Sequence, residues 1–406
     1  MKRTAHHAQI DDDFHHEATV PARSSRVTTF EGWCGIGRLV RVALVHDWLV
    51  TWRGGEKVLA ALAELYPQAP IYTLFHEAAA MPSSLEAHPI VSSFLDRFPG
   101  ARSRHRQFLP LMPAAIRSLE LGPVDLVISS SHCVAKGVRI PEGARHLSYV
   151  HAPLRYMWDR FDDYFGPGKA SPLVRLSARA LRPAFQAWDV ATAASVDRFV
   201  ANSAHVAAQI AERYQRFATV LHPPVELERF TGSSLEASGK GGYFLCLGAL
   251  APYKRIDLAI DAFRKLGWPL WIGGSGQSEA WLRSLPPNVK VLGQVSDAEL
   301  PALYTNARAL IFPGLEDFGI TPLEAQASGR PVIAYRGGGA LETVTARTGL
   351  FFGEQTVDSL LGALEAFEAF EATFDPAAAR AQAERFTKQA FQAGIQREVE
   401  ALGRGD

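Results

Sequence analysis

Short apolar runs recur along the chain and alternate with stretches of helical spacing. Residues 39–46 (LVRVALVH) form an apolar, β-branched run, which is typical of a strand buried on both faces of a parallel sheet. A loop with paired glycines follows, and residues 56–66 (EKVLAALAELY) then have apolar residues at helical spacing. Strand, loop and helix form the βα unit of a doubly wound sheet. We predict further strands at residues 70–75, 124–130, 146–151 and 197–203.

A second series of strand-like runs begins after a change in composition. Residues 220–242 are rich in Pro, Gly and Ser and have no apolar period, as expected of a linker. Between later strands, Ser296 and Glu299 match a capping box, and Gly329 occupies a helix C-terminal position. Residues 383–403 read as an amphipathic helix. Beyond the linker we predict strands at residues 243–248, 269–274, 289–293, 308–313 and 331–335.

These patterns predict an α/β protein of two Rossmann-like, doubly wound domains that face a central cleft. A chain of 406 residues also exceeds the size at which one hydrophobic core keeps growing. A cleft between two domains is a preferred place for a small-molecule site. The predicted parts are a disordered N-terminal extension (1–38), an N-terminal domain (39–222), a linker (223–242), a C-terminal domain (243–385) and a C-terminal helix able to cross back to the first domain (386–406).

Composition removes several classes of protein. Lys plus Arg and Asp plus Glu number 42 each, so the chain lacks the basic excess of a nucleic-acid binder. The three cysteines are far apart and have no zinc-ligand spacing, which favours a reducing, cytoplasmic location. No apolar run approaches the roughly 20 residues that span a bilayer. The His pairs and the run Asp11–Asp13 lie in the aperiodic extension, so we do not count them as metal ligands.

Two carboxylates eight residues apart mark the strongest candidate site. Glu316 follows the strand at residues 308–313, and Glu324 lies one turn into a helix that begins near Ile320. Helix N-termini and turn amides bind anions, and carboxylates accept hydrogen bonds from sugar hydroxyls. One loop would therefore bind both a diphosphate and a sugar. The alternative is a solvated loop acid and a helix acid favoured by the helix dipole.

A pair of cations forms the second candidate. Lys254 and Arg255 follow the first strand of the second domain, at the start of a helix. Fixed cations there would stabilise a departing nucleoside diphosphate. A basic first turn facing water is the alternative, and the helix dipole disfavours it.

Two weaker signals lie in the first domain. Gly54 and Gly55 permit close approach of a ligand to the backbone, although such loops are often only tight turns. His151 ends a predicted strand, where an imidazole could bond a reacting sugar hydroxyl, although a lone histidine is more often structural.

Taken together, these segments resemble family 4 of the retaining glycosyltransferases, which have the GT-B fold. The resemblance runs from about residue 41 to the C-terminus, and its most specific parts are EDFGITPLEA (316–325), PYKRIDLAI (252–260) and YVHAPLRYMWD (149–159). Within the family the chain is similar to bacterial mannosyltransferases that build O-antigen and exopolysaccharide units on lipid carriers, which share the phrases HDWL…GGEK and HAPLRYMWD. The resemblance implies transfer of a hexose, with GDP-mannose as donor, to a lipid-linked or glycan acceptor bound by the first domain.

The resemblance also implies roles for residues of the second domain. Glu316 would hold hydroxyls of the donor sugar and Glu324 the ribose. Lys254 would bind the diphosphate together with the amides of Gly319 and Ile320.

Further roles implied by the resemblance fall at the cleft. Gly54 and Gly55 would admit the phosphate, His151 would contact the donor sugar, and backbone near Val295 would read the base. The family usually has Arg where this chain has Ala249, and Arg255 is our hypothesised substitute.

The implied mechanism needs neither a metal nor a cofactor. The departing phosphate itself would deprotonate the acceptor, which agrees with the lack of an obvious nucleophile and acid pair. Two other classes remain open: a nucleotide-sugar epimerase or hydrolase on the same scaffold, and a non-catalytic nucleotide-sugar binder, which the change at Ala249 faintly suggests.

A basic and apolar segment could rest on the inner face of a membrane. Its residues are Arg102, Arg104 and Arg106 beside Phe108, Leu109, Leu111 and Met112. Such a cluster suits peripheral contact with an anionic surface. A surface turn that leads into a core helix is an equal alternative.

Overall fold

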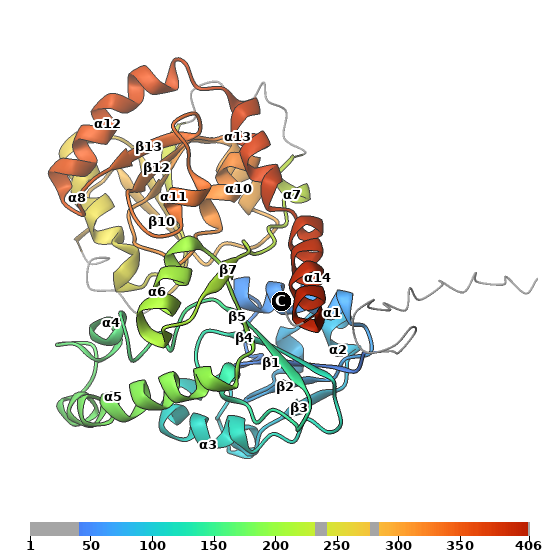
Figure 1. Cartoon of the computed structure of the whole chain (residues 1–406). Helices are drawn as coiled ribbons and strands as arrows, with labels where there is room; N and C mark the ends of the chain where they lie inside the picture. The colour runs from blue at the N-terminus through green and yellow to red at the C-terminus, as the bar shows by residue number, and fades with distance from the viewer. Residues whose placement is uncertain (1–39, 232–241, 277–283, 405–406) are drawn as a thin grey trace, which may run out of the picture.

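The chain folds into two α/β domains, each built on a parallel sheet, and the domains lie one above the other in Figure 1. The computed structural model describes residues 40–231, 242–276 and 284–404, so the predicted extension at residues 1–38 lies outside the described residues. The first sheet has seven strands in the order β3-β2-β1-β4-β5-β6-β7 and the second has six in the order β10-β9-β8-β11-β12-β13. The described strands pair in parallel, which confirms two Rossmann-like domains.

The first domain contains every strand that the apolar runs predict. Its strands are β1 (Val42–His46), β2 (Ile71–Thr73), β3 (Ile90–Ser92), β4 (Leu126–Ser131), β5 (Arg145–Val150), β6 (Arg198–Ala201) and β7 (Ala218–Val220). Its helices are α1 (Gly54–Leu65), α2 (Ser83–Glu86), α3 (Met112–Arg117), α4 (Phe161–Phe165), α5 (Pro172–Thr192) and α6 (Ala204–Tyr214). The sequence missed β3 and β7, because these three-residue edge strands are only partly buried and lack a continuous apolar run.

The second domain also contains all of its predicted strands. They are β8 (Tyr243–Leu247), β9 (Leu270–Gly273), β10 (Val289–Gly293), β11 (Ala307–Phe312) and β12 (Val332–Tyr335), and the edge strand β13 (Gly349–Phe352) was not predicted. The helices are α7 (Glu228–Thr231), α8 (Ile256–Leu266), α9 (Leu300–Thr305), α10 (Thr321–Ala327), α11 (Ala340–Thr343), α12 (Val357–Glu371) and α13 (Pro376–Ala383), and α14 (Lys388–Arg404) ends the chain.

Strand β1 shows why the apolar runs are continuous. All five of its residues are buried, and alternate side chains enter different cores. Ala43 and Val45 belong to the core beneath α3 and α5, whereas Val42 and Leu44 belong to the core that contains α1. A parallel strand covered on both faces cannot tolerate polar alternation.

The end of the chain returns to the first domain. Phe391, Ile395 and Val399 of α14 are buried in the core of the first domain, beside α1. Figure 1 shows this helix (red) lying against the lower domain. Their spacing of four residues places them on one helix face. The apolar face of α14 therefore packs against the first domain rather than against the second.

Part of the predicted linker is anchored. Val225 and Phe230 are buried in a core of the second domain, and α7 forms within this segment. Residues 232–241, which hold most of its Gly and Ser, lie outside the described residues. The Pro, Gly and Ser content of residues 220–242 concealed Val225, Leu227 and Phe230, which are buried together in this core.

Two local signals have structural counterparts. The Ser296 backbone N–H donates to the Glu299 carboxylate at 2.9 Å, although α9 begins only at Leu300. Gly329 has φ of 69° just after α10, the left-handed conformation that ends many helices. Among the described residues, no helix is long and apolar enough to cross a membrane.

Candidate active site

Both sheets reverse their strand order beside a central strand. The reversal lies between β1 and β4 in the first sheet and between β8 and β11 in the second. In open α/β sheets, ligands bind outside the carboxyl ends of the strands at such a switch point. Lys254 and Glu316 follow β8 and β11, the two strands that flank this reversal.

The structure brings Lys254 and Glu316 into direct contact. The ammonium of Lys254, which follows β8, donates to the carboxylate of Glu316, which follows β11, in a short ion pair. The two side chains are 14% and 15% exposed, so the pair is shielded but reachable. Both residues belong to the second domain, 62 positions apart in sequence.

Close contact between two loops makes this pair possible. A Cβ at Gly314 would lie 2.7 Å from the carbonyl oxygen of Tyr253 and 2.8 Å from Cα of Lys254. Any side chain at Gly314 would therefore push the two loops apart. Lys254 also runs beside Gly248, whose added Cβ would lie 3.3 Å from Nζ. Glycines thus set the position of the cation.

Arg255 points to other partners in this structure. It has a left-handed backbone with φ of 49° and stands directly before α8. Its Nε lies 3.3 Å from the Asp257 carboxylate, and Nη1 donates to the carbonyl of Gln355 at 3.5 Å. Its role as substitute for the arginine missing at Ala249 stays a prediction.

Glu324 is held apart from Glu316. It lies in α10, where Tyr304 donates its hydroxyl to Oε2 at 2.7 Å and Arg229 lies 3.4 Å from Oε1. Burial raises the pKa of Glu324 above that of a free glutamate, against the hydrogen bond from Tyr304. The two carboxylates therefore have separate partners, although only eight positions separate them in the sequence.

Ile320 joins the second domain to the first. It stands directly before α10, and the preceding Gly319 has φ of 89°. A Cβ at Gly54, the first residue of α1, would lie 2.9 Å from Cδ1 of Ile320. The amino end of α1 thus touches the amino end of α10 across the domain boundary.

His151 lies on the same side of the first domain. A Cβ at Gly55 would lie 3.9 Å from Nε2 of His151 and 3.5 Å from Cε1 of His46. The structure therefore groups four predicted residues, Gly54, Gly55, His151 and Ile320, around the start of α1.

A buried hydrogen-bonded chain next to His151 was missed by the sequence. The hydroxyl of Ser130 lies 2.8 Å from Nε2 of His151 and 3.1 Å from Nδ1 of His46. Because a hydroxyl donates only one hydrogen, it can donate to one ring and accept from the other. Burial lowers the pKa of both histidines, so both rings are neutral at pH 7.

The signal for this chain was present in the sequence. His46 ends β1, Ser130 lies near the end of β4, and His151 follows β5. These strands are neighbours, so their carboxyl ends share one edge of the sheet. Within the described residues, Nε2 of His46 is buried and has no hydrogen-bond partner, which leaves a polar atom directed at the site.

Val295, predicted to present backbone to a base, follows β10. Its Cγ2 would lie 2.8 Å from a Cβ added at Gly273, so it packs against the carboxyl end of β9. Within the described residues, no hydrogen bond joins its backbone to Lys254 or Glu316. No group of three or more His, Cys, Asp or Glu side chains in the described ranges is placed to hold a metal ion.

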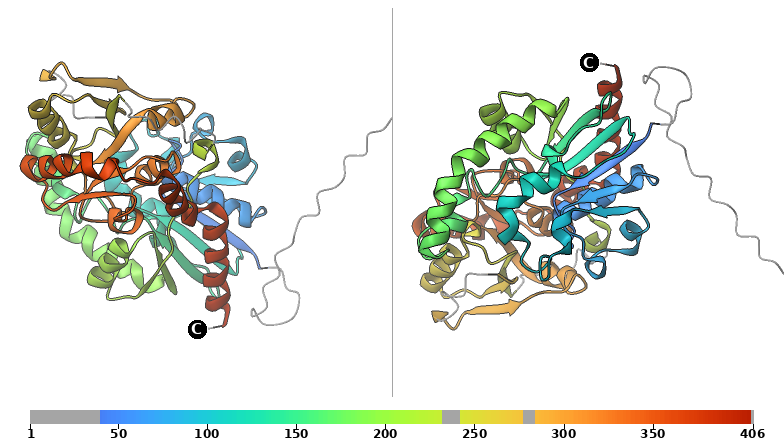
Figure 2. Two further views of the ribbon diagram at one scale, coloured as in Figure 1. Left: turned by 90° about the horizontal axis from the view of Figure 1, so that it is seen from above. Right: turned by 90° about the horizontal axis from the view of Figure 1, so that it is seen from below.

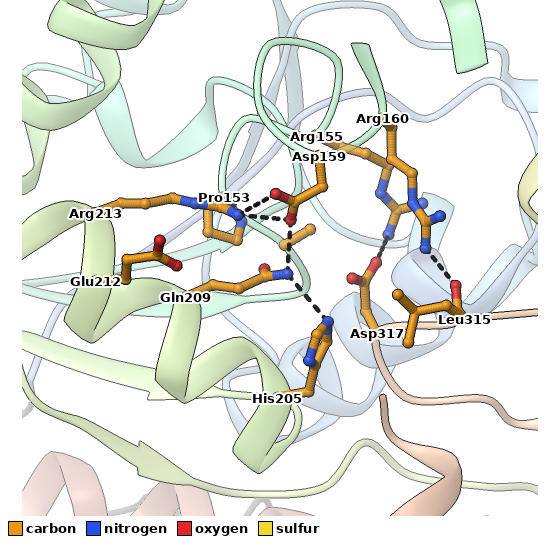
Figure 3. A pocket seen from close by; sticks show the side chains of 11 residues that line it. Pro153, Arg155, Asp159, Arg160, His205, Gln209, Glu212, Arg213, Leu315 and Asp317 are labelled. Atoms are coloured by element: carbon orange, nitrogen blue, oxygen red, sulfur yellow. Dashed lines mark hydrogen bonds and ion pairs between the residues drawn. The ribbon is translucent and has the colours of Figure 1, made fainter. Parts of the chain in front are cut away.

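A polar pocket lies beside the loop that carries Glu316 (Figure 3). Its volume is about 260 Å³, and Leu315 and Asp317 form one wall. The opposite wall comes from the loop after β5 and from α6, with Ala152, Pro153, Arg155, Asp159, Arg160, His205, Gln209, Glu212 and Arg213. The pocket therefore borders both domains.

Hydrogen bonds order the walls of this pocket. Arg155 donates to Asp317 of the other domain at 2.7 Å, and Arg160 donates to the carbonyl of Leu315. On the first-domain side, the Gln209 amide donates to Asp159 at 2.8 Å. Charged and amide groups lining one hollow are suited to bind hydroxyl-rich ligands.

Comparison with known proteins agrees with this geometry. Residues 231–393 match the family of glycosyl transferases group 1. A solved structure of Anabaena HepE with UDP and glucose is 16% identical, covers 89% of this chain and 100% of its own, and has a TM-score of 0.64. Sucrose-phosphate synthase of Thermosynechococcus elongatus is also 16% identical, with coverages of 90% and 100% and a TM-score of 0.68. The chain has the GT-B fold.

Relatives of known name align with only part of this chain. The GDP-mannose-dependent monoacylated alpha-(1-6)-phosphatidylinositol monomannoside mannosyltransferase of Corynebacterium glutamicum is 34% identical over 163 residues, or 34% of this chain and 43% of that protein. O-antigen chain mannosyltransferase B of Escherichia coli is 31% identical over 113 residues, or 23% and 28%. The chain thus spans less than half the length of these relatives. It carries a group 1 glycosyl transferase region and resembles bacterial mannosyltransferases.

Proposed function

We propose that this chain is a retaining, metal-independent hexosyltransferase that moves mannose from GDP-mannose to a lipid-linked or polysaccharide-precursor acceptor. The observation that carries the proposal is the contact between Lys254 and Glu316 at the switch point of the second sheet. A cation for a diphosphate and an acceptor of sugar hydroxyl hydrogens are then side by side, where a hexosyl diphosphate needs both.

In the proposed reaction, the bond between the anomeric carbon and the diphosphate oxygen breaks. The acceptor oxygen forms the new bond on the same face, and its proton passes to the departing phosphate. Lys254 would stabilise the charge that develops on the diphosphate, and its position is set before the reaction. Glu316 would orient the hexose, so that catalysis depends on positioning and electrostatics.

The neutral histidine chain suits the donor sugar. Because burial lowers the pKa of His151, its imidazole would meet a sugar hydroxyl as a neutral hydrogen-bond partner. The Ser130 hydroxyl fixes the orientation of the ring. The names of the Corynebacterium and Escherichia relatives support mannose as the transferred sugar, and the former also names GDP-mannose and a phosphatidylinositol acceptor.

The proposal predicts a clear order of donors. GDP-mannose should raise the melting temperature more than UDP or dTDP sugars at the same concentration, because the ligand with the lowest Kd stabilises the folded protein most. A ligand at 100 times its Kd stabilises by about 2.7 kcal/mol. Transfer to membrane-extracted acceptors should continue in EDTA. Differential scanning fluorimetry and a radiolabelled transfer assay measure these two results.

The same assays separate the alternatives. Full-speed consumption of donor without acceptor would indicate an epimerase or hydrolase. Tight binding without turnover would indicate a non-catalytic binder. Loss of transfer in EDTA, restored by a divalent cation, would contradict metal independence.

We further propose that the pocket beside Leu315 and Asp317 receives the acceptor glycan. It adjoins the Glu316 loop, and Ala152 and Pro153, which follow His151, also line it. Its polar groups come from both domains, so an acceptor there would contact the donor domain as well.

Glu212 offers a test that spares the packing of the pocket. It is an exposed residue of α6 whose carboxylate lines the hollow (Figure 3). Glu212→Ala should raise the acceptor KM about tenfold and leave the donor KM unchanged, because a hydrogen bond to a charged group contributes about 1.5 kcal/mol. Glu365→Ala, an exposed acid on α12, is the control. An unchanged acceptor KM would place the acceptor elsewhere.

A further inference from the structure

Helix α5 presents an apolar face to solvent along its whole length. Leu173 is 74% exposed and Leu176 is 68% exposed. Farther along the same helix face, at intervals of three or four residues, Ala180, Ala184, Ala187 and Val190 are also exposed. Val174 and Leu181 flank this row and are 47% and 41% exposed. We call these eight residues the α5 face.

Helix α5 differs from an ordinary surface helix in what it exposes. Its inward side chains include Ala178, Phe185 and Asp189, so a buried carboxylate faces the core while leucines face outward. A surface helix normally has charged and polar residues on its outer side. Contiguous exposed apolar surface of this kind marks an interaction site.

Cations outnumber acids around the α5 face, and the acids nearest its start are Asp162 and Asp163 of α4. Lys169, Arg175, Arg179 and Arg182 accompany it, and residues 164–188 contain no Asp or Glu. Arg182 is engaged with the carbonyls of Met157 and Trp158. Arg179 and Lys169 are exposed, and Lys169 lies within electrostatic reach of Asp163. Leucines bordered by exposed cations complement an anionic, apolar partner.

We propose that the α5 face docks on a bilayer surface rich in anionic phospholipids. Leu173, Val174 and Leu176 would enter the boundary between headgroups and acyl chains, while Lys169 and Arg179 would contact lipid phosphates. A second copy of the chain fits less well, because two such faces would bring the exposed leucines' flanking cations, Arg175 and Arg179, toward the same cations of the other copy.

The position of α5 connects this surface with the proposed acceptor pocket. Arg182 and Gln186 both donate to the carbonyl of Met157 at 2.9 Å, so α5 holds the loop that contains Arg155 and Asp159. That loop forms one wall of the pocket. Figures 1 and 2 show α5 along the outer edge of the first domain. Docking of α5 on a membrane would present the pocket to a lipid-linked acceptor. This consequence rests on the proposed function, whereas the docking proposal itself does not.

The segment at residues 102–112, for which the sequence left membrane contact and a surface turn equally open, is less suited to membrane contact. Leu109 and Met112 are buried in the core, as the alternative of a surface turn leading into a core helix requires. Arg102 forms ion pairs with Asp96 and Glu77. Two of its apolar side chains and one of its cations are therefore already engaged.

Vesicle co-sedimentation of the full chain tests the proposal without donor or acceptor. We expect binding to vesicles of phosphatidylcholine with phosphatidylglycerol, little binding to pure phosphatidylcholine, and release by high salt. Leu173→Gln/Leu176→Gln should lower the partition coefficient about tenfold or more. Arg179→Gln should weaken only the part that depends on phosphatidylglycerol.

Phe217→Gln is the matched control, because it removes an 84% exposed apolar side chain from a loop outside α5. It should bind vesicles like the wild type, and unchanged thermal unfolding would show that the leucine variant is folded. Equal binding by the leucine variant and the wild type would overturn the proposal, as would no vesicle binding by the wild type. A dimer in sedimentation velocity that the leucine change abolishes, without vesicle binding, would assign the α5 face to a second copy. Vesicle binding by a protein that transfers no sugar would uphold docking while refuting the proposed function.

Discussion

Lys254→Ala should lower kcat/KM for sugar transfer by about 10²–10³, the effect of removing a key electrostatic contact in a transition state. Glu316→Ala should have a loss of the same order. The two side chains neutralise each other, so each single change also leaves a shielded charge without its partner. Steady-state kinetics with varied donor measure both losses.

Because Lys254 and Glu316 touch, their effects should not add. The double alanine variant should lose much less than the product of the single losses, as expected for residues in contact. Lys265→Ala changes an exposed lysine of the neighbouring helix α8 and should leave kcat/KM near the wild-type value. Near-normal turnover in both single variants would refute this assignment of the site.

Lys136→Met should destabilise the fold by about 3–5 kcal/mol, because it leaves a buried carboxylate without its cation. Lys136 Nζ lies 2.8 Å from the Asp189 carboxylate and donates to Thr192 at 2.7 Å, and the lysine is 1% exposed. Asp189 also accepts hydrogen bonds from Trp158 and Tyr214. Urea denaturation measures the change in the free energy of unfolding.

An exposed ion pair provides the comparison for Lys136. Lys265 and Asp358 are 59% and 89% exposed in their side chains, so Lys265→Ala should change stability by less than about 0.5 kcal/mol. Equal effects of the two lysine changes would mean that Asp189 finds water or another partner when Lys136 is removed.

The accuracy of the strand predictions has a simple cause. Buried parallel strands such as β1 and β11 must be apolar on both faces, so each leaves a continuous apolar run in the sequence. The short edge strands β3 and β7 escape this constraint and were missed. Positions at strand ends, such as Lys254 and Glu316, could be placed for the same reason.

The His46–Ser130–His151 chain could not be derived from one motif. His46 and Ser130 are 84 positions apart, and only the pairing of β1 with β4 joins them. The exposure of the α5 face could not be predicted from the sequence either. A row of apolar residues at helical spacing normally indicates a helix face that packs against the core. Its exposure depends on how α5 lies over the sheet.

The sequence by itself determined two doubly wound domains and the loops in which the candidate site lies, because burial on both faces of a parallel sheet dictates residue type strand by strand. The tertiary structure alone decided that Lys254 meets Glu316, that Gly54 meets Ile320, and that the leucines of α5 face outward. Those outcomes depend on strand order and domain packing, which join residues far apart along the chain and leave no local pattern.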